Sequence, residues 1–226
     1  MNKDFKVKET KVRITADNEV AAREVKQMIH DRHAVLINLM GSPGAGKTST
    51  LVRTINALKE EFRIGVMEAD VDSDVDARTI RETGAKVIQL HTGGSCHMDA
   101  DMTKRGLDEM GVDDLDVIFL ENVGNLVCPA EFDVGADLKV MILSVPEGDD
   151  KPLKYPLMFT VSDVMLVNKI DTAPIFDFDF EAAEARAKSL NPKIEVIKIS
   201  SKTGEGYETW IPWLRNKIME VRNESH

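Results

Sequence analysis

The sequence of 226 residues has little cysteine, few aromatic side chains and no long apolar run. Its two cysteines, Cys96 and Cys128, are too few for a disulfide framework, so in a reducing compartment they indicate thiol or metal chemistry. No apolar run reaches the roughly 18 to 20 residues that cross a bilayer. The polar start MNKDFKVKET is unlike a secretory signal. We therefore expect a cytoplasmic protein that does not enter a membrane.

Basic charge is also in deficit, because 29 Lys and Arg face 39 Asp and Glu and give a formal net charge of -10. This balance argues against a general affinity for nucleic acid or for acidic membrane surfaces, so metals and proteins are the expected partners. With 42% hydrophobic residues, the chain is long enough for one domain with a substantial core and too short to promise two.

Short apolar runs rich in Val, Ile and Leu alternate with stretches of helical periodicity. Such runs are typical of buried strands in a mostly parallel sheet. The alternation predicts a doubly wound α/β domain with helices on both faces of the sheet. We divide the chain into an N-terminal segment with one helix, residues 1–34, and a single domain, residues 35–226. The predicted strands are 35–40, 63–67, 86–90, 117–120, 139–145, 164–167 and 194–199. The predicted helices are 15–33, 48–62, 74–83, 99–109, 180–190 and 207–222, and Pro156, Pro174 and residues 147–151 are predicted to lie in surface loops.

One glycine-rich segment matches the phosphate-binding pattern of Gly, four residues, Gly, Lys and Ser or Thr. It follows a predicted strand and opens a predicted helix, which is the context that the pattern requires. Glycine lets consecutive N–H groups converge on phosphate oxygens, and the helix N-terminus adds the positive end of its dipole. We expect Lys47 to bridge the β- and γ-phosphates and the Thr48 hydroxyl to ligate Mg²⁺. The predicted phosphate-binding residues are Gly41, Ser42, Pro43, Gly44, Ala45, Gly46, Lys47 and Thr48.

Carboxylates that complete a Mg²⁺ site are expected where neighbouring strands end, because an open parallel sheet binds ligands at its carboxyl edge. Asp70 and Glu121 each follow a predicted strand, so both are candidate Mg²⁺ ligands, although acidic residues crowd beside Asp70 and a solvated loop is the alternative there. Gly124 would let the backbone approach a γ-phosphate. Asp76 is the next candidate, to orient the attacking water or a mobile loop. The predicted catalytic residues are Lys47, Asp70, Asp76, Glu121 and Gly124.

The sequence Asn-Lys-Ile-Asp follows the predicted strand 164–167. The carboxylate of Asp171 can accept two hydrogen bonds from the guanine N1–H and exocyclic amine, whereas adenine offers no matching pair of donors. The stem of Lys169 can lie over the base, and Asn168 can tie loops together.

Ser200, Ser201 and Lys202 follow the last predicted strand and suit closure over the base through backbone N–H groups and the lysine stem. In register after the phosphate-binding loop, the two motifs favour GTP over ATP. The sequence therefore predicts a GTPase that converts GTP and water to GDP and phosphate.

The two cysteines lie near histidine and near the expected γ-phosphate site. Cys96 precedes His97, and Cys128 lies seven residues after Glu121, so its position would depend on the nucleotide. Thiolate and imidazole suit Zn²⁺ or Ni²⁺. Three protein ligands are one short of a closed structural zinc site, which favours a solvent-open site or one shared between two subunits. Two small buried cysteines and a surface histidine are the alternative that spacing leaves open.

From about Val35 to the C-terminal helix, the chain resembles the hydrogenase nickel-incorporation GTPases, the HypB family. The match covers HTGGSCHMDA at 91–100, ENVGNLVCPAEFDVG at 121–135 and SVPEGDDKPLKYPLMF at 144–159. The resemblance implies a P-loop NTPase fold, as a SIMIBI-class G domain. It further implies a metallochaperone in which GTP favours a homodimer, with the metal site at or near the interface. Nickel delivered with an accessory nickel-binding maturation protein would be inserted into the hydrogenase large subunit.

The resemblance also assigns residues. The family's Ni²⁺ or Zn²⁺ ligands fall on Cys96, His97 and Cys128. Its GTP contacts fall on the 41–48 loop, Asn168, Lys169, Asp171, Ser200 and Lys202. The chain shows neither the N-terminal Cys-rich motif nor the His-rich tract of some members, which implies that only the GTPase-linked site is present. In the first switch, Ala69 and Ser73 replace the family's common Gly and Thr, and Ser73 keeps a hydroxyl.

Two other functions remain open at this point. A related GTPase chaperone of the urease or cobalamin-mutase type would share the nucleotide motifs but carry different residues around the metal loop. A zinc-stabilised GTP-binding scaffold would sequester metal without turnover, and it predicts a tightly held structural zinc with no hydrolysis above background.

Overall fold

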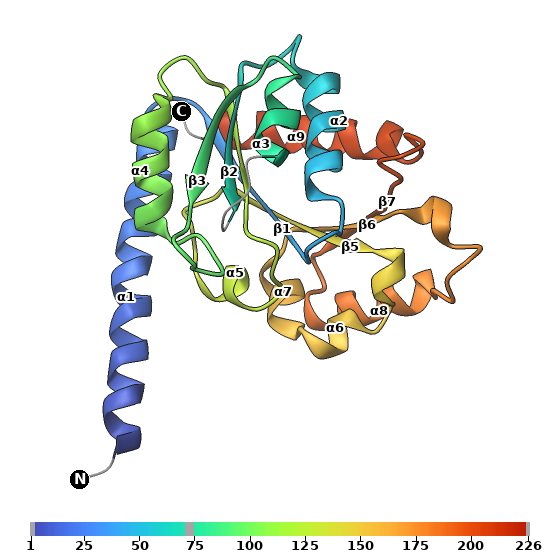
Figure 1. Cartoon of the computed structure of the whole chain (residues 1–226), viewed down its shortest axis with the longest axis horizontal. Helices are drawn as coiled ribbons and strands as arrows, with labels where there is room; N and C mark the ends of the chain where they lie inside the picture. Colours follow the sequence, from blue (N-terminus) through green and yellow to red (C-terminus); the bar gives the residue numbers. More distant parts are fainter. Residues whose placement is uncertain (1–2, 71–74, 225–226) are drawn as a thin grey trace.

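The computed structural model describes the backbone of residues 3–70 and 75–224 and the side chains of residues 16–69 and 76–224. Within these residues, seven strands form one sheet in the order β3-β2-β4-β1-β5-β6-β7, and every pairing is parallel (Figure 1). The strands are β1 (Val35–Gly41), β2 (Ile64–Asp70), β3 (Lys86–His91), β4 (Val117–Glu121), β5 (Leu138–Ser144), β6 (Val164–Asn168) and β7 (Glu195–Lys198). All seven predicted strands are confirmed, with ends that differ by up to three residues.

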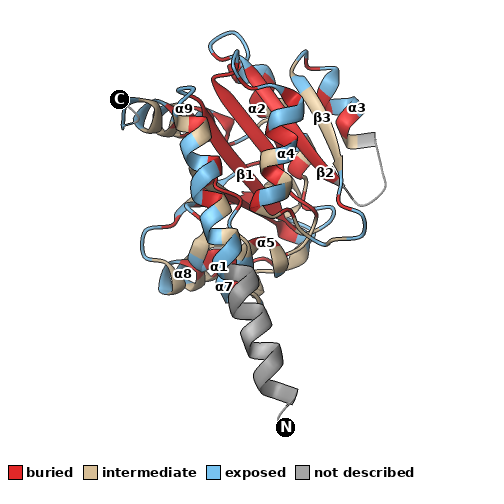
Figure 2. Ribbon diagram, turned by 90° about the vertical axis from the view of Figure 1, so that its left-hand side faces the viewer, coloured by how far each residue is buried: buried red, intermediate tan, exposed pale blue. Residues whose placement is uncertain are grey.

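Helices cover both faces of the sheet, and the most buried strands lie between them (Figure 2). One face packs against α2 (Lys47–Leu58), α3 (Val75–Arg81) and α9 (Tyr207–Glu224). The other face packs against α1 (Lys3–His30) and α4 (Ala100–Met110) on one half and against α7 (Pro156–Val161) and α8 (Phe180–Leu190) on the other. Strands buried on both faces read as continuous apolar runs, which is why the sequence predicted them. The predicted doubly wound α/β fold, a parallel sheet with helices on both faces, is confirmed.

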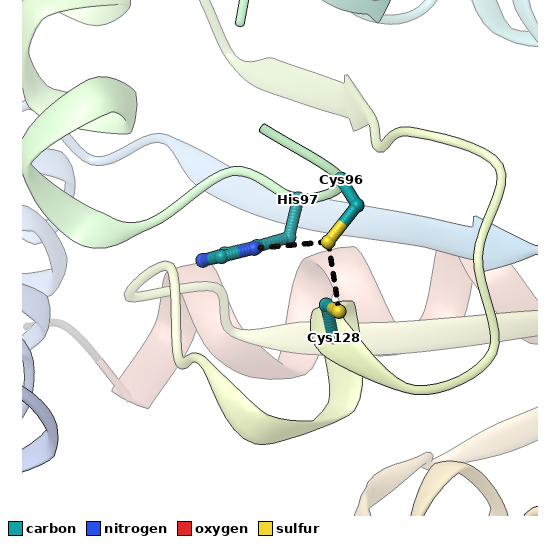
Figure 3. A group of neighbouring side chains, drawn as sticks. All are labelled: Cys96, His97 and Cys128. Atoms are coloured by element: carbon teal, nitrogen blue, oxygen red, sulfur yellow. Dashed lines mark hydrogen bonds between the residues drawn. The ribbon is translucent and has the colours of Figure 1, made fainter. Parts of the chain in front are cut away.

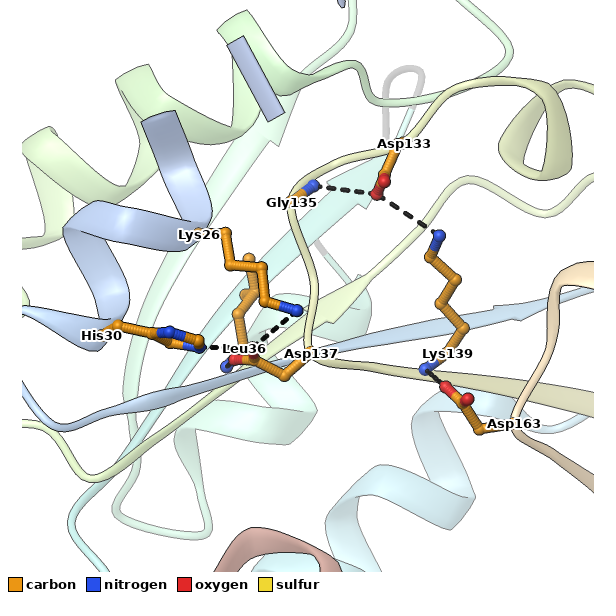
Figure 4. A network of polar contacts seen from close by, with 8 residues as sticks. All are labelled: Lys26, His30, Leu36, Asp133, Gly135, Asp137, Lys139 and Asp163. Carbon is orange, nitrogen blue, oxygen red and sulfur yellow. Dashed lines mark hydrogen bonds and ion pairs between the residues drawn. The ribbon is translucent and has the colours of Figure 1, made fainter. Parts of the chain in front are cut away.

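The N-terminal helix begins at Lys3, earlier than predicted, and runs beside α4 (Figure 1). Its C-terminal end is fixed by the carboxylate of Asp137, whose side chain is 1% exposed and accepts a hydrogen bond from the backbone N–H of Leu36 at 3.0 Å. The same carboxylate contacts His30 Nε2 at 2.7 Å and Lys26 Nζ at 3.4 Å (Figure 4). These contacts join α1 to the start of β1 and to the loop before β5. The division of the chain into residues 1–34 and 35–226 stays a prediction.

Several short helices were not predicted. They are α5 (Cys128–Glu131), α6 (Lys151–Lys154), α7 and the 3₁₀ turns η1 (Val145–Glu147) and η2 (Ile170–Thr172). The prediction of a loop at Pro156 was wrong, because this proline opens α7, where its fixed φ suits the first turn and its missing N–H is not needed. Among the described residues, no helix is both long and apolar enough to span a membrane.

Candidate nucleotide and metal site

The glycine-rich loop joins the C-terminal end of β1 to the N-terminus of α2, in the middle of the sheet. Gly44 and Gly46 have φ of 74° and 97°, a left-handed conformation that glycine adopts without strain. A Cβ added at Gly46 would collide with the Nδ2 atom of Asn168. The loop is thus wrapped closely around the start of the helix, as a phosphate cradle requires.

The predicted phosphate and Mg²⁺ residues meet beside this loop. Thr48 Oγ1 donates a hydrogen bond to Glu121 Oε1 at 2.7 Å, and Lys47 Nζ donates to the carbonyl oxygen of Ser42 at 3.4 Å. A hydroxyl and a carboxylate in contact are oxygen ligands of the kind that Mg²⁺ takes, so the residues present fit a Mg²⁺–nucleotide complex. Asp76 lines the same cavity of about 300 Å³ as Lys47 and Glu121. The side chain of Asp70 and all of Ser73 lie outside the described residues.

One acidic residue of this cavity was missed by the sequence analysis. Glu68 lies on β2, is 2% exposed, and is the register partner of Glu121 on β4. A carboxylate inside an apolar strand was the signal that could have identified it.

The Asn-Lys-Ile-Asp segment lies against the phosphate loop. Asn168 is buried and donates from Nδ2 to the carbonyl oxygen of Ala45 at 2.9 Å, and its Oδ1 accepts from the backbone N–H of Ser201 at 3.1 Å. Lys169 has a left-handed φ of 62°, and its Nζ donates to the carbonyl oxygen of Gly44 at 2.6 Å. Asn168 therefore ties the phosphate loop to the loop after β7, as predicted.

The carboxylate of Asp171 is held by the loop after β7. The buried Ser200 donates from Oγ to Asp171 Oδ1 at 2.6 Å, whereas Lys202 is exposed. Ser201 also contacts Thr50 Oγ1 of α2 at 2.8 Å through its hydroxyl. A carboxylate held in this position can accept hydrogen bonds from guanine through its oxygen atoms. The roles of Asp171, Ser200, Ser201 and Lys202 in binding GTP stay predictions.

Cys96, His97 and Cys128 converge in one chain (Figure 3). Their ligand atoms all lie within 4.8 Å of one another. Cys96 Sγ is 2.8 Å from Cys128 Sγ and 3.8 Å from His97 Nδ1. Cys96 is exposed, while the other two side chains are half-buried. Two sulfurs and one imidazole, open on one side, can hold a thiophilic divalent cation with a coordination position to spare.

Local structure orients these ligands. Asp99 caps α4 by accepting from the backbone N–H of Met102 at 2.8 Å, which fixes the chain just after His97. The ring of Phe132 stacks on the His97 imidazole with centroids 4.0 Å apart and planes at 20°. Phe132 could not be identified from sequence, because its stack on His97 depends on how α5 packs against the 91–100 loop.

The pKa shifts in this cluster affect metal binding in opposite directions at the imidazole and at the thiol. Burial lowers the pKa of His97, against the opposing charges of Asp99 and Glu131, and this favours the neutral imidazole that ligates metals. The pKa of the Cys128 thiol is raised, first because it pairs with Cys96 and then because of burial. A cation at this cluster would therefore displace thiol protons.

Comparisons with known proteins agree on one family. The CobW/HypB/UreG nucleotide-binding domain matches residues 35–198. The hydrogenase maturation factor HypB of Azotobacter vinelandii is 47% identical over 206 residues, which covers 90% of this chain and 67% of that protein.

Two solved structures have the same fold at similar identity. The structure of HypB from Archaeoglobus fulgidus has a TM-score of 0.84 and 38% identity, and the match covers 90% of this chain and 99% of that chain. The structure of HypB from Helicobacter pylori in complex with nickel has a TM-score of 0.84 and 35% identity, and the match covers 90% of this chain and 96% of that chain.

Proposed function

The chain belongs to the HypB family of hydrogenase maturation factors, and on this basis we propose that it is a GTP-hydrolysing nickel metallochaperone. GTP binding and hydrolysis would be coupled to insertion of nickel into the hydrogenase large subunit. Nickel is the cargo of this protein, whereas GTP is its substrate and Mg²⁺ its cofactor.

One observation carries the proposal. The segment of residues 121–128 begins at Glu121, which contacts Thr48 in the phosphate loop, and ends at Cys128, which contacts Cys96 in the metal cluster. This segment of eight residues thus connects the place where a γ-phosphate would lie to a thiol that can bind nickel. A change in the nucleotide has a short covalent path to the metal ligands.

The residues of the nucleotide site have distinct roles in this proposal. The phosphate loop binds the triphosphate through backbone N–H groups, and Lys47 stabilises the charge that develops on the γ-phosphate. Asp171, positioned by Ser200, selects guanine. Thr48, Glu121 and Asp70 would hold Mg²⁺, which would supply neutralisation of the charge on the phosphate oxygens. Asp76 and Gly124 line or border the cavity in which an attacking water would be oriented.

The metal cluster suits transfer rather than storage. Cys96 is exposed and three ligands leave a coordination position open, so an accessory nickel-binding maturation protein can donate the ion and the hydrogenase large subunit can receive it. The same open position supports a GTP-favoured homodimer in which the partner's cluster completes the site.

Nickel titration and phosphate release, measured on the same variants, test this proposal. Cys96→Ala and His97→Ala should lose nickel binding while GTP hydrolysis persists, because neither residue lies at the phosphate loop. His91→Ala is the matched control, since His91 is exposed at the end of β3, just before the loop that carries Cys96 and His97, and lies outside the cluster. Tightly held zinc, unfolding of Cys96→Ala and no hydrolysis above background would instead identify a zinc-stabilised scaffold.

A further inference from the structure

Residues 124 and 125 are fastened to the start of the phosphate loop. The backbone N–H of Asn125 donates to the carbonyl oxygen of Gly41 at 3.0 Å, and these two residues form an isolated β-bridge. A Cβ added at Gly124 would lie 2.9 Å from the backbone nitrogen of Pro43. Because residues 124 and 125 pack this closely against Pro43 and Gly41, a shift of the phosphate loop also moves Asn125.

The side chain of Asn125 reaches both metal-binding segments. Its Nδ2 donates to the carbonyl oxygen of Cys96 at 3.4 Å. Its Oδ1 accepts from the backbone N–H of Val127 at 2.8 Å, one residue before Cys128. One amide therefore joins the main chain of one thiol ligand to the segment that carries the other.

A second amide fixes the opposite end of the Cys96–His97 pair. Asn122 is 1% exposed, and its Oδ1 accepts from the backbone N–H of Met98 at 3.2 Å. Its Nδ2 donates to Asn38 Oδ1 in the middle strand β1 at 3.2 Å. The Met98 end of the ligand loop is thus attached to the buried sheet, while the Cys96 end is attached to the phosphate loop through Asn125.

We propose that Asn125 is the positioning residue that couples the nucleotide to the metal cluster, an inference that rests on the proposed function. With Met98 held by the sheet, displacement of the phosphate loop pulls the Cys96 carbonyl and turns Cys96 relative to Cys128. Asn125 acts through the ligands, because its side-chain amide bonds to the Cys96 carbonyl and the Val127 N–H and is not itself one of the candidate ligand groups.

The affinity for Ni²⁺ in two nucleotide states tests this role. Ni²⁺ alone is titrated into the protein with GDP and with a non-hydrolysable GTP analogue, and the near-ultraviolet absorption of the Ni²⁺–thiolate bond reports binding. For the wild type we expect the two affinities to differ by about 5- to 150-fold, the usual range of coupling between sites. In Asn125→Ala the ratio of the two Ni²⁺ affinities should fall to about one. The substitution keeps the backbone hydrogen bond to Gly41, so only the side-chain amide is removed.

Two further variants make the result specific. Asn125→Asp keeps the acceptor for Val127 but cannot donate to the Cys96 carbonyl, so it should also lose the ratio. Its added charge acts in both nucleotide states and cancels from the ratio. Asn216→Ala, an exposed asparagine of α9, is the matched control and should keep the wild-type ratio.

The possible contrary results distinguish failure of the Asn125 role, failure of the coupling and failure of the proposed function. A wild-type ratio in Asn125→Ala or in Asn125→Asp would overturn the inference. So would an equal loss of Ni²⁺ affinity in both nucleotide states, which is what removal of a purely structural contact gives. Equal affinities in the two states of the wild type would overturn the coupling and leave the nickel site standing. Absence of Ni²⁺ binding by the wild type in any state would instead reject the proposed function.

Discussion

Replacing Asp116 by Asn should lower the free energy of unfolding at pH 7 by about 1 to 2 kcal/mol, and by much less near pH 2. The Asp116 carboxylate accepts hydrogen bonds from Arg63 Nε at 2.9 Å, from Arg63 Nη2 at 3.0 Å and from the backbone N–H of Arg63 at 2.9 Å. Arg222 of α9 lies 3.0 Å from the same carboxylate. These groups, the Arg63 side chain foremost, lower the pKa of Asp116 from 3.8 to about 2.

A pKa difference of this size corresponds to about 2 kcal/mol, because each unit is worth about 1.4 kcal/mol. The Asp116 side chain is 12% exposed, but Arg63 is 62% exposed, so screening by solvent reduces the figure. The unfolded chain binds the proton more tightly than the folded one. The contribution is therefore complete above about pH 4 and is lost as the pH falls towards 2.

Urea unfolding of the wild type and Asp116→Asn at pH 7, 4 and 3 measures this contribution. Asp113→Asn is the matched control, because Asp113 pairs with Arg32 at 2.8 Å but is 83% exposed, and its loss should cost less than about 0.5 kcal/mol. The reasoning is refuted if the gap between wild type and Asp116→Asn is as large at pH 3 as at pH 7, or if it is no larger than that of the control.

Substitutions at three other positions test the site and the core. Phe132→Leu removes the ring that stacks on His97, and since such pairs are worth about 0.5 to 1.5 kcal/mol, the affinity for Ni²⁺ measured by calorimetry should fall about 2- to 12-fold. Asp171→Asn should weaken GTP binding by about 100-fold or more and favour xanthosine triphosphate, which presents a carbonyl in place of the amine; competition binding that still prefers GTP would contradict the guanine assignment. Thr54→Val removes the acceptor, 3.0 Å away, of the buried Trp210 Nε1–H and should cost about 1 to 3 kcal/mol in urea unfolding, whereas Thr54→Ser keeps the hydroxyl and should cost less.

The sequence predicted the strands and helices whose apolar residues follow a local pattern. The buried strands are mostly apolar runs, and helices such as α8 repeat their apolar residues over several turns. The helices α5 and α6 have four residues each, which is too short for any such repeat. They form because the chain must turn between buried strands, and that requirement is set by the tertiary structure.

The candidate site also has a part that the sequence predicts and a part that depends on the tertiary structure. The phosphate loop and the Asn-Lys-Ile-Asp segment are contiguous, so spacing alone predicts their chemistry. Glu68 and Glu121 become neighbours only because β4 inserts between β2 and β1, an order that strand periodicity cannot fix. Cys96 and Cys128 were predicted to act together from residue type and resemblance, since 32 residues separate them.

Asn122 and Asn125 show why coupling is harder to predict than binding. Asparagine is common in turns, where its side chain bonds to nearby backbone, so the Asn-Val-Gly-Asn sequence predicts only a turn. The folded chain instead directs both amides to the 96–98 loop, at Met98 and at Cys96. Metal–ligand distances tolerate only about 0.2 Å, so a small turn of Cys96 away from Cys128 is enough to change the affinity for nickel. A large rearrangement of the domain is therefore not needed for the nucleotide to control the metal, and two side-chain amides are sufficient.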